Sequence, residues 1–252
     1  MAFIQCSFYS HILGMECNAN VILPLGRKNV LPTAKKTDIP VLYLIHGFTE
    51  DYSVWIRRTS VERYASDKNI AIVMPNVHRS FCIDAKYGLQ YFKFVSEELP
   101  CIMQNMFGLS AKREDNFTAG LSMGGYSALK IALSCPDRFC AAASLSGAVD
   151  INRVFNDKDH INETRAFFGD KVEDCNDLYY LASHADPMPA VYQACGTDDF
   201  MYYDNRKFSE FMSGINDNYV YTEEEGIGHT WTYWDKEIKK VLEWVQGLND
   251  RV

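Results

Sequence analysis

The sequence predicts an α/β protein in which helices flank a mostly parallel central sheet. Short, continuous apolar runs of strand length recur along the chain, as in residues 41–45 and 70–74, and such runs are typical of strands buried on both faces. Segments with apolar residues at helical spacing separate several of these runs. A serine bounded by glycines stands where a strand-like run passes into a helix-like one, at residues 119–125. Alternation of strands and helices is the pattern of an α/β fold.

The remaining elements follow from the same periodicities. Residues 3–9 and 17–23 alternate roughly with period two and predict an opening pair of antiparallel strands. Further strands are expected at 41–45, 70–74, 116–119, 139–145, 190–195 and 219–223. Helices are expected at 60–68, 87–107, 126–133, 204–212 and 231–245. Pro100 should kink the second of these helices or start a new one, because proline has no N–H to donate. The polar residues 24–40 are expected to form an exposed loop.

The length and composition describe one ordinary globular domain. The chain has 252 residues, of which 47% are hydrophobic, and this fits a single α/β domain with a large core. From about residue 152 to residue 188 the apolar pattern loosens, which predicts a cap or lid inserted into the domain. We therefore expect one domain over residues 1–252 with a small cap insertion at 152–188.

The net charge indicates which partners to exclude, and the cysteines indicate the compartment and the absence of a metal site. A net charge of −8 disfavours nucleic acid and anionic membranes. We see neither a secretory signal nor an apolar run near the ~20 residues that span a bilayer. The eight cysteines are scattered without a Cys-x-x-Cys pair, so we expect reduced thiols in a cytoplasmic protein and no metal site. Whether the chain forms a homo-oligomer is left open.

The stretch Gly120-Leu121-Ser122-Met123-Gly124 carries the chemistry. Gly-x-Ser-x-Gly between a strand and a helix is a nucleophile elbow, in which a strained turn lifts the serine hydroxyl clear of the sheet. Gly120 and Gly124 are needed because side chains there would collide where the strand and the helix cross. The Met123 N–H and the start of the helix would face the oxygen that becomes negative during acyl transfer. Ser122 is therefore the predicted nucleophile.

His46 and Gly47 follow the expected strand at 41–45. In the α/β-hydrolase pattern the loop after this strand supplies the second backbone donor of the oxyanion hole. Gly47 would let the backbone approach a substrate, and we assign the second donor to the Phe48 N–H. His46 is expected to pack or hydrogen-bond beneath the site rather than to act as a base.

An aspartate and a histidine complete the pattern, each just beyond a predicted strand. Open α/β sheets place their active sites at that edge, and the order Ser122, Asp199, His229 is that of the α/β-hydrolase triad. His229 would take the proton of Ser122, while an aspartate would hold the imidazole and stabilise its positive charge. A Gly-x-x-Asp turn favours Asp199 over its neighbour Asp198. Asp150, just beyond another strand, is the fallback acid.

Nearly the whole chain resembles the bacterial tributyrin esterases, within the esterase D and feruloyl/acetyl-xylan esterase group of α/β-hydrolases. The stretches that carry the resemblance are 42–47, 61–63, 73–76, 97–100, 119–126, 195–200 and 229–234. The elbow and the stretch 229–234 are the most specific of them. The resemblance implies a serine carboxylesterase that acts on short acyl esters without a cofactor, and it supports Phe48 and Met123 as oxyanion donors.

Other functions can use the same triad. The S-formylglutathione hydrolases, a related branch, carry a cysteine shortly after the oxyanion glycine, whereas residues 47–51 here read Gly-Phe-Thr-Glu-Asp. Such a thioesterase is therefore the alternative rather than the first choice. An acyltransferase also stays open, because an alcohol can resolve the acyl-enzyme in place of water. A binding protein without catalysis would show a broken triad, and this triad is intact.

Aromatic residues near these motifs predict a narrow pocket for a small-molecule acyl ester. We assign Trp55, Phe168 and Trp231 to the substrate pocket, close to Phe48. Large, rigid rings near the nucleophile would leave room for only a few acyl carbons. We therefore expect acetyl to butyryl esters, including acetylated or feruloylated small sugars, as substrates.

Overall fold

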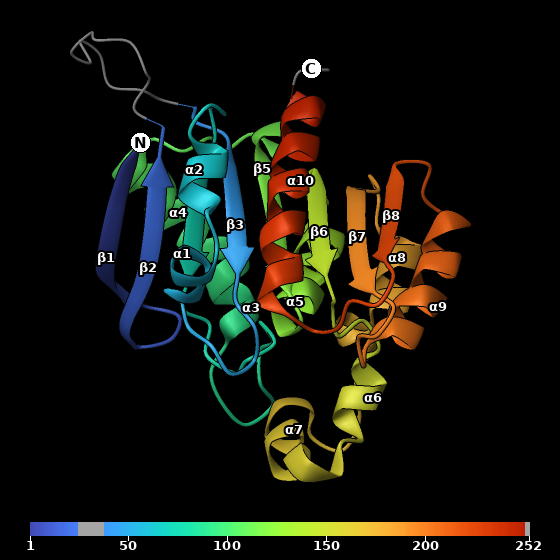
Figure 1. Ribbon diagram of the computed structural model, residues 1–252. Coiled ribbons are helices and arrows are strands. Elements are labelled where there is room, and N and C mark those ends of the chain that lie inside the picture. Colours follow the sequence, from blue (N-terminus) through green and yellow to red (C-terminus); the bar gives the residue numbers. More distant parts are fainter. Residues whose placement is uncertain (25–37, 250–252) are drawn as a thin grey trace, which may run out of the picture.

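A sheet of eight strands forms the centre of the structure, a computed structural model that describes residues 1–24 and 38–249 (Figure 1). The strands are β1 (Ala2–Ser10), β2 (Met15–Leu23), β3 (Val41–Ile45), β4 (Ala71–Pro75), β5 (Asn116–Leu121), β6 (Ala141–Leu145), β7 (Ala190–Gly196) and β8 (Tyr219–Glu224). Their order across the sheet is β1-β2-β4-β3-β5-β6-β7-β8. Most of the loop expected at 24–40 lies outside the described residues.

The strand directions confirm a mostly parallel sheet. β1 pairs with β2 and β2 with β4 in antiparallel fashion, and every other neighbouring pair is parallel. The carboxyl ends of β3, β5, β6 and β7 therefore meet at one edge of the sheet. Every residue of β3, β4, β5 and β6 is buried, which explains why these strands appear in the sequence as continuous apolar runs.

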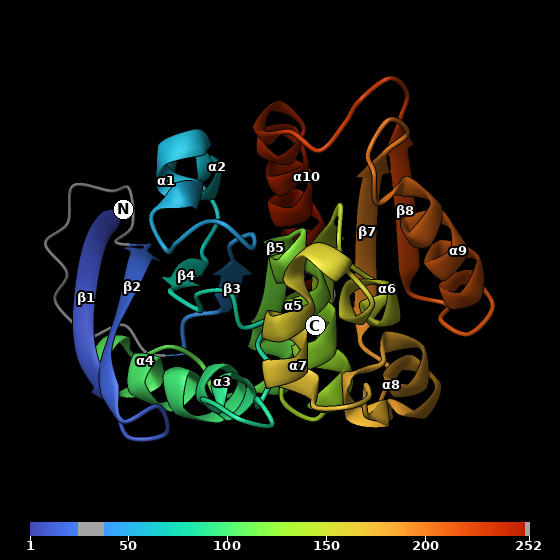
Figure 2. The same ribbon diagram turned by 90° about the horizontal axis from the view of Figure 1, so that it is seen from below.

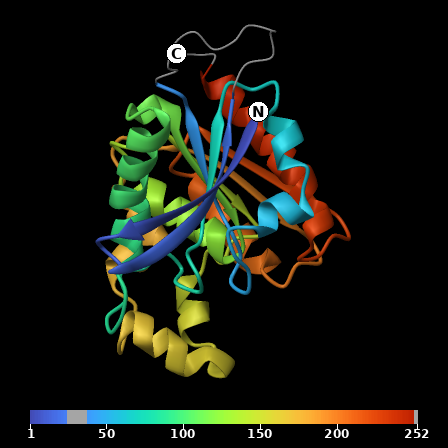
Figure 3. The same ribbon diagram turned by 90° about the vertical axis from the view of Figure 1, so that its left-hand side faces the viewer.

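Helices cover both faces of the sheet (Figures 1 and 3). The helices on one face are α1 (Val54–Arg58), α2 (Val61–Ala65) and α10 (Trp231–Asn249), and those on the other are α3 (Tyr91–Lys93), α4 (Leu99–Phe107), α5 (Met123–Ser134), α8 (Leu178–His184) and α9 (Tyr202–Ser213). Two hydrophobic clusters result. Trp55 and Ile238 belong to the first, and Leu99, Leu129 and Phe208 belong to the second.

The helix expected over 87–107 is interrupted. Helix α3 passes into a π-helical turn at Phe94–Glu98, and α4 follows directly. Pro100 lies in the first turn of α4, where it cannot donate to the carbonyl four residues earlier. The helix is therefore irregular near Pro100, as predicted: it changes from π-helical to α-helical hydrogen bonding there, and no loop interrupts it.

The region 152–188 has two parts. Helices α6 (Ile151–Phe155) and α7 (Ile161–Phe168), joined by the 3₁₀ turn Lys158–His160, extend beyond the carboxyl ends of the strands (Figure 1). Figure 2, seen from below, shows both helices in front of the sheet. The second part, the turn Asp174–Asn176 and α8, returns to α5, where the Tyr126 hydroxyl donates to the Asn176 carbonyl at 2.7 Å.

Two further findings concern the whole described chain. No helix within residues 1–24 and 38–249 has the length and apolar character needed to cross a bilayer. All eight cysteines are free, and Cys6, Cys17, Cys82 and Cys195 are buried.

Candidate active site

Ser122 occupies a strained turn between β5 and α5. Its φ is +53° and its ψ is −117°, a conformation that side-chain-bearing residues rarely adopt. The strand and the helix approach very closely around it. A Cβ on Gly120 would lie 2.4 Å from backbone atoms of Gly124, and a Cβ on Gly124 would lie 2.4 Å from the Ile45 carbonyl oxygen. Both glycines are therefore required, as the sequence pattern predicts.

Backbone hydrogen bonds hold the strained serine in place. The Ser122 N–H donates to the Leu145 carbonyl at 2.9 Å, and the Ala148 N–H donates to the Ser122 carbonyl at 3.1 Å. Strain of this kind costs about 1–3 kcal/mol and persists only where the surroundings over-determine it. These bonds tie the elbow to β6 and to the segment that follows it, so the serine stays raised above the sheet edge.

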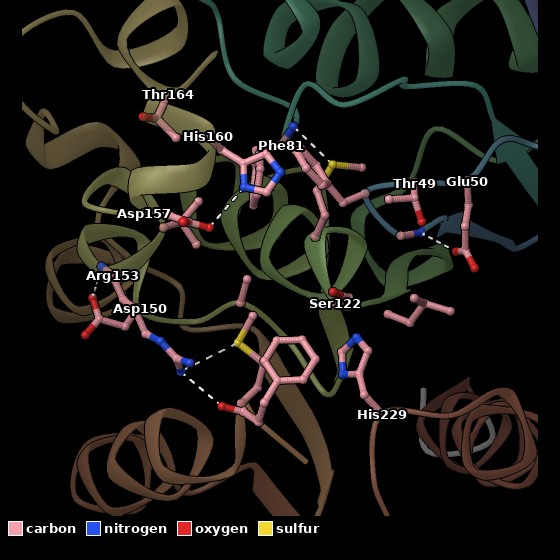
Figure 4. A pocket seen from close by; sticks show the side chains of 18 of the residues that line it. Thr49, Glu50, Phe81, Ser122, Asp150, Arg153, Asp157, His160, Thr164 and His229 are labelled. Atoms are coloured by element: carbon pink, nitrogen blue, oxygen red, sulfur yellow. Dashed lines mark hydrogen bonds and ion pairs between the residues drawn. The ribbon is translucent and has the colours of Figure 1, made fainter. Parts of the chain in front are cut away.

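Asp199 and His229 form a hydrogen-bonded pair beside this serine. The His229 Nδ1 lies 2.8 Å from Oδ2 and 3.0 Å from Oδ1 of Asp199. Because Nδ1 is engaged by the carboxylate, Nε2 is the ring nitrogen that faces the cavity, and Figure 4 shows the His229 ring turned toward Ser122. Burial acts to raise the pKa of Asp199, but the bonds from His229 and from the Met201 N–H outweigh it and hold that pKa below its usual value. The aspartate is therefore a buried anion that orients the imidazole.

The two other candidate acids do other things. Asp198 is exposed, and its Oδ1 accepts only a long bond from the Thr197 hydroxyl at 3.4 Å. Asp150 caps α6, where its Oδ1 accepts the N–H groups of Asn152 and Arg153 at 3.1 and 3.2 Å. A carboxylate at a helix N-terminus is well placed for that structural role.

Two aromatic rings fix the orientation of His229. The Phe200 ring lies 4.6 Å from it at an angle of 45°, and the Trp234 ring lies 4.7 Å away in a T-shaped arrangement. Trp234 is itself held by its Nε1–H, which donates to the Ser146 hydroxyl at 3.1 Å. The imidazole is thus confined by packing as well as by Asp199.

The loop after β3 is anchored by Glu50, which the sequence analysis did not single out. The Gly47 N–H donates to Glu50 Oε2 at 3.0 Å, and the Trp231 Nε1–H donates to Glu50 Oε1 at 2.9 Å. One carboxylate therefore links the expected oxyanion loop to the segment that follows His229. An acidic residue next to that loop was visible in the sequence, but its partner is 181 residues away.

His46 lies beneath this loop, as expected. It is 1% exposed, its Nδ1–H donates to the Gly47 carbonyl at 2.8 Å, and its Nε2 accepts the Val77 N–H at 3.1 Å. Burial lowers the pKa of His46 to about 4, so the ring is neutral. Both ring nitrogens are engaged, which leaves neither for proton transfer with a substrate.

A cavity of about 920 Å³ opens over Ser122 and His229. Phe48, Met123 and Trp231 line it together with Ser122. Trp55 and Phe168 do not. Trp55 is fully buried under α10, where its Nε1–H donates to the Ile45 carbonyl at 3.1 Å and its ring packs on Trp231. Phe168 is 4% exposed and packs on Phe155, so its neighbour Phe167 faces the cavity instead.

The cap supplies most of the polar lining. The carboxylates that line the cavity are Glu50, Asp150, Asp157 and Glu163, and the guanidinium is that of Arg153. Glu163 forms a bidentate ion pair with Arg79, with both N–O distances at 2.7 Å. The Arg79 guanidinium also lies 3.7 Å from the centre of the Phe48 ring, so Arg79 links the cap to the loop after β3. Nothing in the sequence signalled this contact, because its partners come from three separate segments.

No group of three or more His, Cys, Asp or Glu side chains in the described parts of the chain is placed to hold a metal ion. A serine hydroxyl, an imidazole and a buried carboxylate in this order can generate a nucleophile at neutral pH.

Comparisons with known proteins show the family of this chain. The family model "Putative esterase" matches residues 10–245. An acetyl esterase of Caldicellulosiruptor saccharolyticus is 32% identical over 267 residues, and the match covers 99% of this chain and 100% of that protein.

Two solved structures from Staphylococcus aureus are also similar. One is the substrate-bound fluorophosphonate-binding serine hydrolase F, with a TM-score of 0.89 and 32% identity over 97% of this chain and 98% of that one. The other is the S-formylglutathione hydrolase FrmB, with a TM-score of 0.86 and 33% identity over 97% of this chain and 98% of that one. These likenesses confirm the predicted α/β-hydrolase fold.

Proposed function

This chain belongs to the esterase family of carboxylic ester hydrolases, and we propose that it cleaves short-chain acyl esters through a covalent intermediate on Ser122. One observation carries the proposal. Ser122 stands on a strained elbow facing His229, whose other ring nitrogen is bonded to the buried Asp199. Each of these three groups is of little use for acyl transfer alone, and their arrangement supplies nucleophile, base and orienting anion together.

The reaction follows from the positions of these groups. His229 Nε2 takes the hydroxyl proton as Ser122 Oγ attacks the ester carbonyl, and the backbone N–H groups of Phe48 and Met123 receive the developing oxyanion. The tetrahedral intermediate collapses when His229 returns the proton to the leaving alcohol. Water then attacks the acyl-enzyme with His229 again as the base, which releases the acid and frees Ser122. Asp199 stabilises the imidazolium in both steps.

The aromatic lining of the cavity supports short acyl groups. Its apolar lining near the nucleophile is formed by aromatic and other bulky side chains, such as Phe48, Phe81 and Trp231. Each methylene that fits gains roughly 0.8 kcal/mol, and one that does not fit gains nothing. kcat/KM should therefore peak between acetate and butyrate and fall at least about tenfold by octanoate. Tributyrin and acetylated or feruloylated small sugars belong to the same substrate class.

A thioesterase acting on S-formylglutathione is the second candidate, because the chain is similar to FrmB. Two features of the site count against it. The loop after Gly47 has no cysteine, and three of the four carboxylates among the described lining residues, Glu50, Asp150 and Asp157, have no arginine or lysine partner. The glutathione moiety carries two carboxylates and one ammonium group, and its net negative charge opposes binding at such a site. A direct comparison of an acetyl ester with S-formylglutathione distinguishes the two functions.

Ser122→Ala tests the proposal. Loss of a catalytic serine lowers kcat by on the order of 10⁴–10⁶ in enzymes of this chemistry, and the protein should remain folded. A fluorophosphonate probe should label the wild-type protein at Ser122 and fail to label the variant. A variant that keeps a tenth of the wild-type activity on p-nitrophenyl acetate would refute the assignment. Adding an alcohol and measuring the partition between acid and new ester shows whether acyl transfer competes with hydrolysis.

A further inference from the structure

A second hollow lies on the outer side of the cap. It has a volume of about 420 Å³ and lies between α7 and the segment that follows β4. We call it the outer groove, and its apolar lining comes from Met15, Ile83, Tyr87, Leu89, Tyr91 and Phe167. Tyr87 and Leu89 are 73% and 42% exposed, so the groove is accessible from solvent at that side.

Phe167 separates this groove from the cavity over Ser122. Within the described residues, it is the one residue that lines both hollows. The wall continues as an ion pair, because Arg79 lines the outer groove and Glu163, its bidentate partner, lines the inner cavity. Phe167 and the Arg79–Glu163 ion pair therefore lie between the inner cavity and the outer groove. The outer groove is mainly apolar.

The backbone at this point is held independently of the Phe167 side chain. The Lys86 N–H donates to the Phe167 carbonyl at 2.8 Å, and the Tyr87 N–H donates to the Ala166 carbonyl at 3.1 Å. Truncating the ring leaves both bonds in place. The expected result is an opening between the two hollows rather than displacement of α7.

The cap offers a long acyl chain mainly polar side chains, so such a chain would need the opening past Phe167 to reach the outer groove. Beyond the apolar surroundings of Ser122, the cavity presents Asp157, His160 and Glu163 (Figure 4 labels the first two). A hydrocarbon chain gains nothing by covering charged groups that already have partners. Past Phe167, the mainly apolar outer groove would offer it further apolar surface.

We propose that Phe167 is the residue that limits acyl-chain length, because it closes the active-site cavity against the outer groove. This inference rests on the proposed esterase function and concerns the acyl side of the same site. Acyl chains longer than butyryl are then poor substrates of the wild-type protein, and they would enter the groove if the ring were removed.

The test measures kcat/KM for p-nitrophenyl acetate, butyrate, octanoate and decanoate in wild type and Phe167→Ala. Each methylene that gains a place in the groove should raise kcat/KM by up to about fourfold, so the octanoate-to-acetate ratio should rise at least about tenfold. Phe168→Leu is the matched control, since Phe168 is the adjacent ring and lines neither hollow. It should keep the wild-type ratio.

A second variant makes the test specific to the groove. Leu89 lines only the outer groove, and Leu89→Trp should leave the wild-type ratio unchanged because the chain never reaches that point. In the double variant Phe167→Ala/Leu89→Trp the added ring should refill the groove and return the ratio toward wild type. A widened specificity that persists in the double variant would mean that the groove is not involved, and the proposal would be overturned.

Two other outcomes also contradict the inference. An unchanged ratio in an active Phe167→Ala enzyme would show that the ring does not limit the acyl chain, and it would leave the esterase function intact. Butyl acetate and octyl acetate vary the alcohol instead of the acyl chain. If Phe167→Ala changed the kcat/KM ratio only for this pair, Phe167 would limit the alcohol side of the site instead. Failure of the esterase function itself would be evident separately, as absence of fluorophosphonate labelling at Ser122.

Discussion

Replacing Asp199 with asparagine changes one charge and almost no volume. The Asp199 carboxylate accepts bonds from His229 Nδ1 at 2.8 and 3.0 Å and from the Met201 N–H at 2.8 Å. In Asp199→Asn the amide oxygen can still accept from Met201, which turns the NH₂ group toward Nδ1. Nδ1 must then be the unprotonated nitrogen, and the proton moves to Nε2, the atom that has to accept the proton of Ser122. We expect kcat to fall by about 10²–10⁴, as for triad acids in other serine hydrolases.

The assay is kcat/KM on p-nitrophenyl acetate and butyrate, with circular dichroism to confirm the fold. KM should change little, because Asp199 does not line the cavity. Asp198→Asn and Asp150→Asn serve as controls and should each cost less than about tenfold, since one carboxylate is exposed and the other caps α6. If Asp150→Asn proved more damaging than Asp199→Asn, the assignment of the acid would be wrong.

The remaining predictions concern groups beneath and beside the nucleophile. His46 has a pKa of about 4 in the folded protein against an ordinary 6.5, so folding disfavours its protonated form. The free energy of unfolding should therefore be highest above pH 6.5 and should fall by about 3 kcal/mol as the pH is lowered to about 4. Urea unfolding between these pH values should show a weaker pH dependence in His46→Gln, and an identical dependence would refute the argument. Glu50→Gln and Trp231→Phe should each lower kcat by about threefold to thirtyfold with KM little changed, and together should cost scarcely more than either alone. Additive losses would show that the Glu50–Trp231 bond does not position the oxyanion loop.

The sequence was sufficient to predict those elements whose residue pattern is recognisable within a single segment. Strands β3, β4 and β6 are buried on both faces, so their apolar runs identified them without knowledge of their neighbours. The elbow was equally local, because Gly120 and Gly124 are required by backbone atoms only a few residues away or on the adjacent strand. The short helices α1, α6, α7 and α8 were not predicted, since five to eight residues offer too few turns for a helical period to be recognised.

Aromatic residues show the limit of this reasoning. Trp55, Phe168 and Trp231 were all placed in the substrate pocket from their distance along the chain to the motifs. The structure puts Trp231 at the cavity and the other two in the packed core. Residue type cannot decide between these places, because a large ring is equally suited to a core and to a pocket wall.

The sequence by itself therefore determined the order of the strands along the chain, the elbow around Ser122 and the candidates for acid and base. Only the tertiary structure decided which acid is bonded to His229, that Glu50 joins the loop after β3 to Trp231, and that Phe167 lines two hollows. These contacts connect segments that are distant in sequence, such as Arg79 and Glu163, 84 residues apart. The spacing of apolar residues within a segment indicates which of its faces is buried in the core. Contacts between distant side chains exist only once the sheet and the cap have brought those segments together.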